Sequence, residues 1–210
     1  MQDIEKFITG FKLFQQSYFG EDNDLFDRLK QRQQPRTLIV SCCDSRVDPA
    51  ILTSSEPGDL FVVRNVANIV PPCETGGGQH GISAALEFGV CSLQVKHIIV
   101  MGHSQCGGIR ALMENSYGSG EGGYISTWMS IVAPAREKVR KELPNKPIEM
   151  QARACEQAAI LLSLENLLSF PWIEKRVNNG DLQLHGWYFD LSKGELMGYD
   201  AGAKNFAPLK

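Results

Sequence analysis

The chain has 210 residues, of which 43% are hydrophobic and 21% charged, and its formal net charge is -3. This length predicts one domain with a sizeable core rather than two full domains. The small negative charge gives no electrostatic reason to expect a nucleic acid or an anionic membrane as a partner. The apolar runs fall well short of the roughly 20 residues that cross a bilayer.

The first residues, MQDIEKFITGFKLF, contain Asp3 and Glu5 and lack the basic start and apolar stretch of a signal peptide. We therefore expect a cytoplasmic protein. The six cysteines fit that compartment if they are reduced thiols. They include no Cys-x-x-Cys pair, which argues against a zinc ribbon and against a thioredoxin-like site.

Residues 1–33 are predicted to form an N-terminal helical arm. Its apolar anchors are separated by charged residues: Phe7, Phe11, Phe14, Tyr18, Phe26 and Leu29. So many aromatic residues on a terminal segment indicate that it packs onto something, such as another subunit. We interpret residues 34–210 as a single α/β domain.

Strands and helices are predicted to alternate in that domain. Continuous Val, Ile and Leu runs, typical of strands buried on both faces, occupy residues 36–42, 59–65 and 97–102. A strand at 182–191, a Lys193-Gly194 turn and ELMGY after it indicate a hairpin at the sheet edge. Helices are predicted for residues 77–93, 124–142 and 148–168. The fold class is therefore α/β, with a mostly parallel sheet of about four to five strands flanked by helices.

Gly76, Gly78 and Gly81 match the G-x-G-x-x-G fingerprint of dinucleotide-binding proteins. The fingerprint requires a strand directly before it, but two prolines at 71 and 72 intervene. It also requires an acid about 20 residues further on, where this chain has an Ile-Ile-Val run. We interpret the glycines as a flexible lead into the helix at 77–93.

Two predicted strands end in polar residues that could form a metal site. CCDSR (42–46) ends the first strand, and GHSQCGG (102–108) ends the strand at 97–102. Because ligands bind at the carboxyl ends of strands in open α/β sheets, we expect Cys42, His103 and Cys106 to meet there. Asp44 and Arg46 should lie close by. Two thiolates and one imidazole are a zinc-binding set that leaves the fourth position open, as in catalytic sites.

The simpler interpretation is that His103 caps a turn and that both cysteines are core residues. The coincidence of all three at facing strand ends, beside an acid and an arginine, favours the metal site. Cys106 also precedes Gly107-Gly108 and a predicted helix, whose N-terminus would help to keep the sulfur ionised. Cys43 alternates with Cys42 along the strand, so we expect it to face away and serve packing. The remaining cysteines are interpreted as structural: Cys73, Cys91 and Cys155.

These motifs resemble those of the β-class carbonic anhydrases: Cys-x-Asp-x-Arg after one strand and His-x-x-Cys after another. The likeness continues through EPGDLFVVRNVANIVPP (56–72), GHSQCGGIRALM (102–113) and residues 166–196, and it covers nearly the whole chain from about Gln33 onward. The resemblance implies that Cys42, His103 and Cys106 bind one Zn2+ per chain. It also implies that Asp44 and Arg46 form the catalytic dyad.

The resemblance further implies a narrow substrate cleft, a pair of substrates and an assembly. Gln33, Phe61, Val66 and Phe88 fall where the family lines its cleft, with Gln33 and Phe61 near the dimer boundary. Many relatives carry a tyrosine at the position of Phe88, so a role that needs that hydroxyl is not expected here. The substrates would be CO2 and bicarbonate. The family forms dimers or multiples of dimers, with N-terminal helices laid over the partner subunit.

The expected function is that of a zinc-dependent carbonate dehydratase. Such an enzyme catalyses the reversible hydration of CO2 to bicarbonate and a proton through zinc-bound hydroxide. Asp44 would orient the hydroxide, and Arg46 would hold Asp44 ionised and pointed. Three alternatives remain open from the residues alone. They are hydrolysis of carbon disulfide or carbonyl sulfide on the same fold, a non-catalytic zinc or redox sensor, and a Cys2His alcohol dehydrogenase that would need the nucleotide site rejected above.

The resemblance also bears on regulation. Some bacterial members switch off when bicarbonate enters a second pocket, built from a tryptophan three residues before the first cysteine, an arginine and a tyrosine. In that state the aspartate leaves the arginine and becomes a zinc ligand, which makes Asp44 a further candidate metal ligand. This chain keeps a plausible arginine, Arg64, but has Ile39 at the tryptophan position. We therefore expect Asp44 to pair with Arg46, without bicarbonate inhibition through that pocket.

Overall fold

The computed structural model describes residues 2–20, 24–74, 76, 80–117 and 123–209. Contacts within the chain divide it into an N-terminal unit, residues 1–34, and an α/β unit, residues 35–210. Among the described residues, no helix is both long enough and apolar enough to cross a membrane.

The N-terminal unit contains two helices, α1 (Gln2–Tyr18) and α2 (Leu25–Leu29). The prediction of a helical arm is confirmed for these two segments, whereas residues 32–35 have no regular structure. The two helices contact each other through aromatic rings, with 5.7 Å between the centroids of Phe14 and Phe26, and Phe19, just after α1, stacks on Phe26 at 4.5 Å. Phe7 and Phe11 on α1 are instead exposed.

The α/β unit is built on a six-stranded sheet with the order β2-β1-β3-β4-β5-β6. Its strands are β1 (Thr37–Cys42), β2 (Leu60–Asn65), β3 (His97–His103), β4 (Gln183–Asp190), β5 (Glu195–Asp200) and β6 (Asn205–Pro208). The first four are parallel, and the last two are antiparallel. The mostly parallel sheet is thus confirmed, but it has one strand more than predicted, because the four-residue edge strand NFAP carries too little pattern to be recognised.

Helices and helical turns connect the strands of this unit. They are α3 (Pro49–Thr53), η1 (Val66–Asn68), α4 (Gly81–Glu87), η2 (Phe88–Ser92), α5 (Gly107–Glu114), α6 (Tyr124–Met129), η3 (Ser130–Val132), α7 (Ala133–Glu142), α8 (Ile148–Leu168) and α9 (Pro171–Asn178). The prediction for 148–168 is confirmed. Part of the glycine-rich lead at 76–81 lies outside the described residues, so its conformation stays a prediction.

The predicted helix at 124–142 is wrong in one respect, since it is two α-helices separated by a 3-10 turn. Pro134 lies in the first turn of α7. Proline fits the first turn of a helix but lacks an N–H for the helix interior, so it starts a new helix here. Pro171 likewise begins α9, which was not predicted, and Pro49 begins α3.

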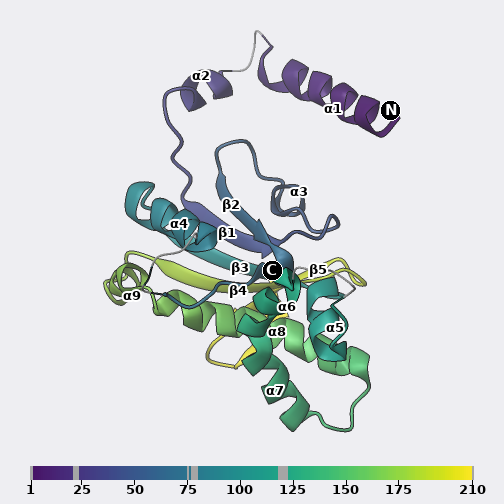
Figure 1. The fold of residues 1–210 in the computed structure, drawn as a ribbon. Helices are drawn as coiled ribbons and strands as arrows, with labels where there is room; N and C mark the ends of the chain where they lie inside the picture. Colours follow the sequence, from purple (N-terminus) through teal and green to yellow (C-terminus); the bar gives the residue numbers. More distant parts are fainter. Residues whose placement is uncertain (1, 21–23, 75, 77–79, 118–122, 210) are drawn as a thin grey trace. The chain divides into compact units, whose positions relative to one another are not determined.

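The hydrophobic core covers both faces of the sheet, as expected for parallel strands. On one face Leu38 and Val40 of β1 pack with Ile160 of α8 in the largest apolar cluster. On the other face Ile39 and Met101 belong to a smaller cluster. Figure 1 shows α8 running along the sheet beside β3 and β4. The helix is thus placed to reach the carboxyl ends of these strands.

The parallel register brings the carboxyl ends of β1 and β3 together. Ser41 lies opposite Met101, and β3 continues to His103, which lies opposite Phe189 of β4. The residues that follow β1 and β3 therefore share one edge of the sheet.

Candidate metal centre and active site

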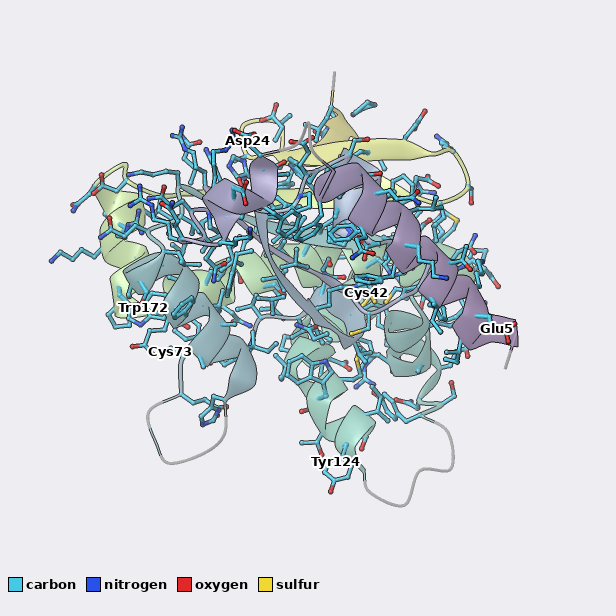
Figure 2. All side chains as sticks on the ribbon, turned by 90° about the horizontal axis from the view of Figure 1, so that it is seen from above. Glu5, Asp24, Cys42, Cys73, Tyr124 and Trp172 are labelled. Atoms are coloured by element: carbon cyan, nitrogen blue, oxygen red, sulfur yellow. The ribbon has the colours of Figure 1, made fainter. Side chains whose placement is uncertain are left out.

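Cys42, His103 and Cys106 meet at this edge as the sequence predicted. All three are buried, and their ligand atoms lie within 4.8 Å of one another. The Cys42 and Cys106 sulfur atoms are 4.0 Å apart. Zinc–sulfur bonds of about 2.3 Å at a tetrahedral angle would place two sulfurs roughly 3.8 Å apart, so the cluster matches the size of a zinc site. Figure 2 shows the Cys42 side chain among interior side chains, whereas Tyr124 points outward.

The imidazole of His103 is oriented to act as a ligand through Nε2. Its Nδ1 lies 2.9 Å from the carbonyl oxygen of Ser104, which requires the proton to be on Nδ1. Its Nε2 is then an acceptor, and within the described part of the chain it is buried without a hydrogen-bond partner. A buried acceptor without a partner is costly unless something binds it. A metal ion would satisfy it.

The thiols of this cluster are electrostatically coupled. A hydrogen bond from Cys106 lowers the pKa of Cys42, and the same contact raises the pKa of Cys106. Burial opposes the charged form of His103, but the contacts with the Cys42 sulfur, the Ser104 carbonyl and the Asp44 carboxylate together raise the pKa of the imidazole. Since thiols and imidazoles bind metals in their deprotonated forms, metal binding would release protons here. The group therefore has the chemistry of a metal site.

Asp44 and Arg46 form the predicted ion pair beside the cluster. Arg46 donates from Nε to Oδ1 over 2.9 Å and from Nη2 to Oδ2 over 2.7 Å. These hydrogen bonds hold the pKa of Asp44 well below its usual range. Asp44 Oδ2 is also 3.9 Å from His103 Nε2, so the carboxylate lies next to the cluster and stays ionised.

Arg64 of β2 holds the turn after β1, which carries Asp44 and Arg46, through hydrogen bonds. Its Nε donates to the carbonyl oxygen of Cys42 over 2.9 Å, and its Nη2 donates to that of Asp44 over 2.8 Å. Its Nη1 donates to Asp48 Oδ2 over 2.8 Å. Asp48 in turn caps the N-terminus of α3. Each of the three guanidinium nitrogens thus donates a hydrogen bond that shapes the turn after β1.

The other cysteines lie outside the cluster. Cys43 faces away from it as predicted, but its expected packing role is wrong for this chain, because the side chain is exposed and lines an open hollow with Val66 and Trp128. Cys155 is buried, which agrees with a structural role, and burial raises its pKa to about 12. Cys73 is half-buried, and Cys91 is exposed, so the structural interpretation of Cys91 is also wrong within the chain.

Three of the four predicted cleft residues belong to the α/β unit. Phe61 of β2 and Phe88 at the start of η2 contact each other, with ring centroids 5.9 Å apart. Val66 directly follows β2, and its carbonyl oxygen accepts a hydrogen bond from Trp128 Nε1 over 2.8 Å. Gln33 belongs to the N-terminal unit. The structure therefore brings Phe61 and Phe88 together and places Val66 at the start of η1, where it lines the same hollow as Cys43.

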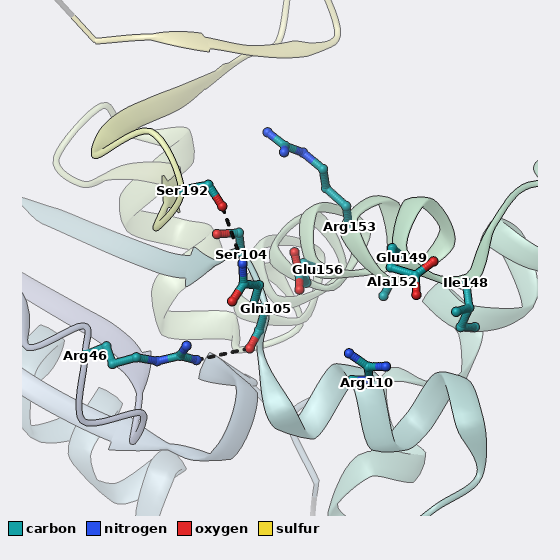
Figure 3. A pocket seen from close by; sticks show the side chains of 10 residues that line it. All are labelled: Arg46, Ser104, Gln105, Arg110, Ile148, Glu149, Ala152, Arg153, Glu156 and Ser192. Atoms are coloured by element: carbon teal, nitrogen blue, oxygen red, sulfur yellow. Dashed lines mark hydrogen bonds between the residues drawn. The ribbon is translucent and has the colours of Figure 1, made fainter.

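A buried acid next to Cys106 was missed by sequence reasoning. Glu156 of α8 accepts a hydrogen bond from the Cys106 N–H over 3.0 Å and one from the Tyr188 hydroxyl over 2.6 Å. Burial raises the pKa of Glu156, and the two hydrogen bonds oppose that rise. The sequence did contain one signal for it. Glu156 lies on the same buried face of α8 as Ile160 and Ser163, and a charged residue is unusual on such a face. Figure 3 shows Glu156 on α8 beside Gln105.

Fold and site together define a class of protein, an α/β protein with an open Cys2His centre at the carboxyl edge of a parallel sheet and an acid–arginine pair next to it. The sequence model of the family described as carbonic anhydrase matches residues 37–196. A carbonic anhydrase of Synechocystis is 36% identical over 203 residues, which cover 97% of this chain and 73% of that protein. β carbonic anhydrase 5 of Arabidopsis thaliana, a chloroplastic protein, is 41% identical over 86% of this chain and 60% of its own length.

Solved structures give the same result. The β-carbonic anhydrase CcaA superposes with a TM-score of 0.92 at 35% identity, covering 100% of this chain and 93% of that one. One of two tetrameric β-carbonic anhydrases of Sordaria macrospora superposes with a TM-score of 0.83 at 26% identity, covering 94% and 97%. The chain therefore belongs to the β carbonic anhydrase family. It is an enzyme that catalyses the hydration of CO2, and zinc dependence is typical of this family.

Proposed function

We propose that Cys42, His103 and Cys106 hold one zinc ion per chain and that Asp44 and Arg46 form the catalytic dyad for CO2 hydration. The single observation that supports this most strongly is the buried Nε2 of His103, which lies near two sulfur atoms and has no hydrogen-bond partner among the described residues. When bound, zinc acidifies a water molecule in its open position and so supplies a nucleophile for CO2 near neutral pH. The protein side chains then have to orient that nucleophile and admit CO2.

Asp44 would orient the nucleophile. Asp44 Oδ2 lies 3.9 Å from His103 Nε2, next to the cluster. This oxygen can accept a further hydrogen bond. The ion pair with Arg46 keeps the carboxylate ionised, so it acts as an acceptor rather than as a donor. Arg46 fixes the direction of the carboxylate, because a two-pronged contact leaves it little rotational freedom.

Four residues are proposed to line the CO2 cleft, as the family resemblance implies: Gln33, Phe61, Val66 and Phe88. Gln33 and Phe61 would lie near the dimer boundary. Apolar side chains suit a small substrate without net charge, and the Phe61–Phe88 ring contact supports a shared wall for two of them. Phe88 has no hydroxyl, so it cannot take part in proton transfer. The product, bicarbonate, would leave through the same cleft.

We further propose that the protein is a cytoplasmic dimer or a multiple of dimers. All six cysteines are free thiols, which suits a reducing compartment. The exposed phenylalanines of α1 support packing against a second subunit, and the Sordaria relative is described as tetrameric. Cell fractionation tests the location.

The deciding experiment combines metal analysis with stopped-flow CO2 hydration on the full chain. We expect about one zinc per chain, and we expect Cys106→Ala to lose both the metal and the activity. Full activity in metal-free protein would contradict the proposal. Carbon disulfide and carbonyl sulfide should be included as substrates, because faster turnover of either would assign the site to their hydrolysis.

A further inference from the structure

The peptide group between Gln105 and Cys106 makes a hydrogen bond on each side. Its carbonyl oxygen accepts a hydrogen bond from Arg46 Nη2 over 3.2 Å, and its N–H donates to Glu156 Oε1 over 3.0 Å. The same planar group thus lies between a guanidinium on one side and a carboxylate on the other. It joins the arginine of the dyad to a proposed zinc ligand.

This peptide lies in a turn with an unfavourable backbone conformation. Gln105 has a φ of 59°, a left-handed conformation that costs free energy for a residue other than glycine. Rotation of the peptide plane would exchange the positions of the carbonyl and the N–H. A carbonyl oxygen would then face the Glu156 carboxylate, and an N–H would face the Arg46 guanidinium. Both contacts would be repulsive, so Glu156 and Arg46 select the observed orientation.

Glu156 is itself held in place. Only 5% of the residue is exposed, and its second oxygen accepts the Tyr188 hydroxyl at 2.6 Å. Both partners are buried, and the helix that carries Glu156 packs against β3 and β4. The carboxylate therefore has little freedom to leave the Cys106 N–H.

Glu156 also lines a hollow next to this peptide, but the charges there do not indicate a ligand-binding role. The hollow has a volume of about 350 Å³ and includes three arginines in its lining: Arg46, Arg110 and Arg153 (Figure 3). Each of these guanidiniums already pairs with an acid of its own. Glu149 and Glu156 add negative charge to the same wall. These charges do not favour an anionic ligand, so the contact with the Cys106 peptide remains the function that the geometry assigns to Glu156.

We propose that Glu156 is a positioning residue for the CO2-hydrating centre, which it serves by fixing the Gln105–Cys106 peptide between itself and Arg46. This inference rests on the proposed zinc site and dyad. By holding the N–H, Glu156 sets the position of the Cys106 sulfur. Because that hydrogen bond fixes the peptide plane, it also orients the Gln105 carbonyl oxygen toward Arg46. Arg46 in turn orients the Asp44 carboxylate. A single buried acid thus couples the metal ligands to the dyad.

Glu156→Leu and Glu156→Gln test the proposal, since leucine removes the acceptor and glutamine keeps an oxygen that can accept the Cys106 N–H. We expect Glu156→Leu to lower zinc affinity and kcat by about 10–100-fold, the range found for partners of metal ligands, with KM nearly unchanged. Glu156→Gln should recover most of both. Zinc affinity is measured by chelator competition and does not depend on turnover.

Ser163→Ala is the matched control. Ser163 lies on the same buried stripe of α8, and its hydroxyl accepts the N–H of Val70 over 3.1 Å, away from the centre. Its loss should lower the free energy of unfolding but leave zinc affinity and kcat within about twofold. Equal losses of zinc affinity and kcat in Ser163→Ala and Glu156→Leu would show a purely structural effect and overturn the inference.

The wild-type protein separates this inference from the proposed function. If wild-type protein binds no zinc, the proposed function fails. If it binds zinc and hydrates CO2 while Glu156→Leu retains wild-type zinc affinity and kcat, only the role of Glu156 fails.

Discussion

Arg46 contacts Asp44 in three ways. Its backbone N–H donates to Asp44 Oδ1 over 3.0 Å, and its Nε and Nη2 donate to the two carboxylate oxygens over 2.9 and 2.7 Å. Only 17% of the Asp44 side chain is exposed, whereas Arg46 is about half exposed. A partly buried carboxylate is thus fixed by a guanidinium that reaches in from the surface.

This pairing determines how the dyad responds to pH. Hydrogen bonds from Arg46 place the pKa of Asp44 below its ordinary value. The pair therefore stabilises the fold at pH values above about 4, the ordinary pKa of aspartate, and that contribution is lost as the pH falls through the lower folded pKa. Between pH 6 and 9 the paired Asp44 stays ionised, and even the ordinary pKa of an aspartate lies well below this range.

The first prediction concerns Arg46→Gln. We expect CO2 hydration to fall by about 10–100-fold, because the carboxylate loses its orientation. Raising the pH from 6 to 9 should leave the ratio of mutant to wild-type rates constant, since Asp44 is already ionised. In both proteins the rate itself should rise with pH through neutrality, because zinc held by two thiolates and one imidazole would acidify its bound water only weakly. Stopped-flow rates across this range provide the measurement.

Arg110→Gln is the control for this experiment. Arg110 lines the same hollow but pairs with Glu114 on α5 over 2.9 Å, away from Asp44. Its rates should match those of the wild-type protein. A variant of Arg46 that regains full activity at high pH would mean that the arginine controls protonation rather than orientation.

The sequence could predict the part of the site that comes from strand ends. Parallel strands of similar length must end at one edge, so Cys42, His103 and Asp44 could be brought together without coordinates. The support from Glu156 could not be predicted, because 50 residues separate it from Cys106 and the contact is to a backbone N–H, which carries no side-chain signal. The sixth strand was missed for a related reason. Its four residues are ordered by pairing with β5 rather than by their own pattern.

The second prediction concerns bicarbonate. Ile39 is fully buried in β1, and the Arg64 guanidinium already donates to Asp48 and to two carbonyl oxygens. Ile39 offers no indole N–H to an anion, and each nitrogen of the Arg64 guanidinium already donates to a protein oxygen. We expect CO2 hydration at neutral pH to show only simple product inhibition as bicarbonate is raised. A sigmoidal loss of activity, together with a crystal structure in which Asp44 has left Arg46, would show that the inhibitory switch operates without the tryptophan.

The third prediction compares two neighbouring glycines at the start of α5. A Cβ on Gly108 would lie 2.8 Å from Val66 Cγ1 and 3.3 Å from Ala67 Cβ, whereas a Cβ on Gly107 would have no atom of the described residues within 4 Å. Overpacking costs about 1–3 kcal/mol, and the gain in helix propensity from alanine is about 1 kcal/mol. Gly108→Ala should therefore lower the free energy of unfolding, while Gly107→Ala should leave it unchanged or raise it slightly. Urea denaturation measures both, and equal effects would refute the packing argument.

The last prediction concerns α1 in the proposed dimer. Phe7 and Phe11 are 68% and 60% exposed, and α1 carries further exposed apolar residues at Ile4 and Ile8. Burying a phenylalanine against a partner contributes about 1.5–3 kcal/mol, and each 1.4 kcal/mol corresponds to a tenfold change in affinity. The double variant Phe7→Ser/Phe11→Ser should therefore weaken self-association by at least about 100-fold. It should appear as a smaller species by light scattering at micromolar concentration. The matched variant Lys6→Ser/Lys12→Ser changes the same helix without removing apolar surface, and it should keep the wild-type mass. If both variants keep that mass, the apolar face of α1 does not contribute to the assembly.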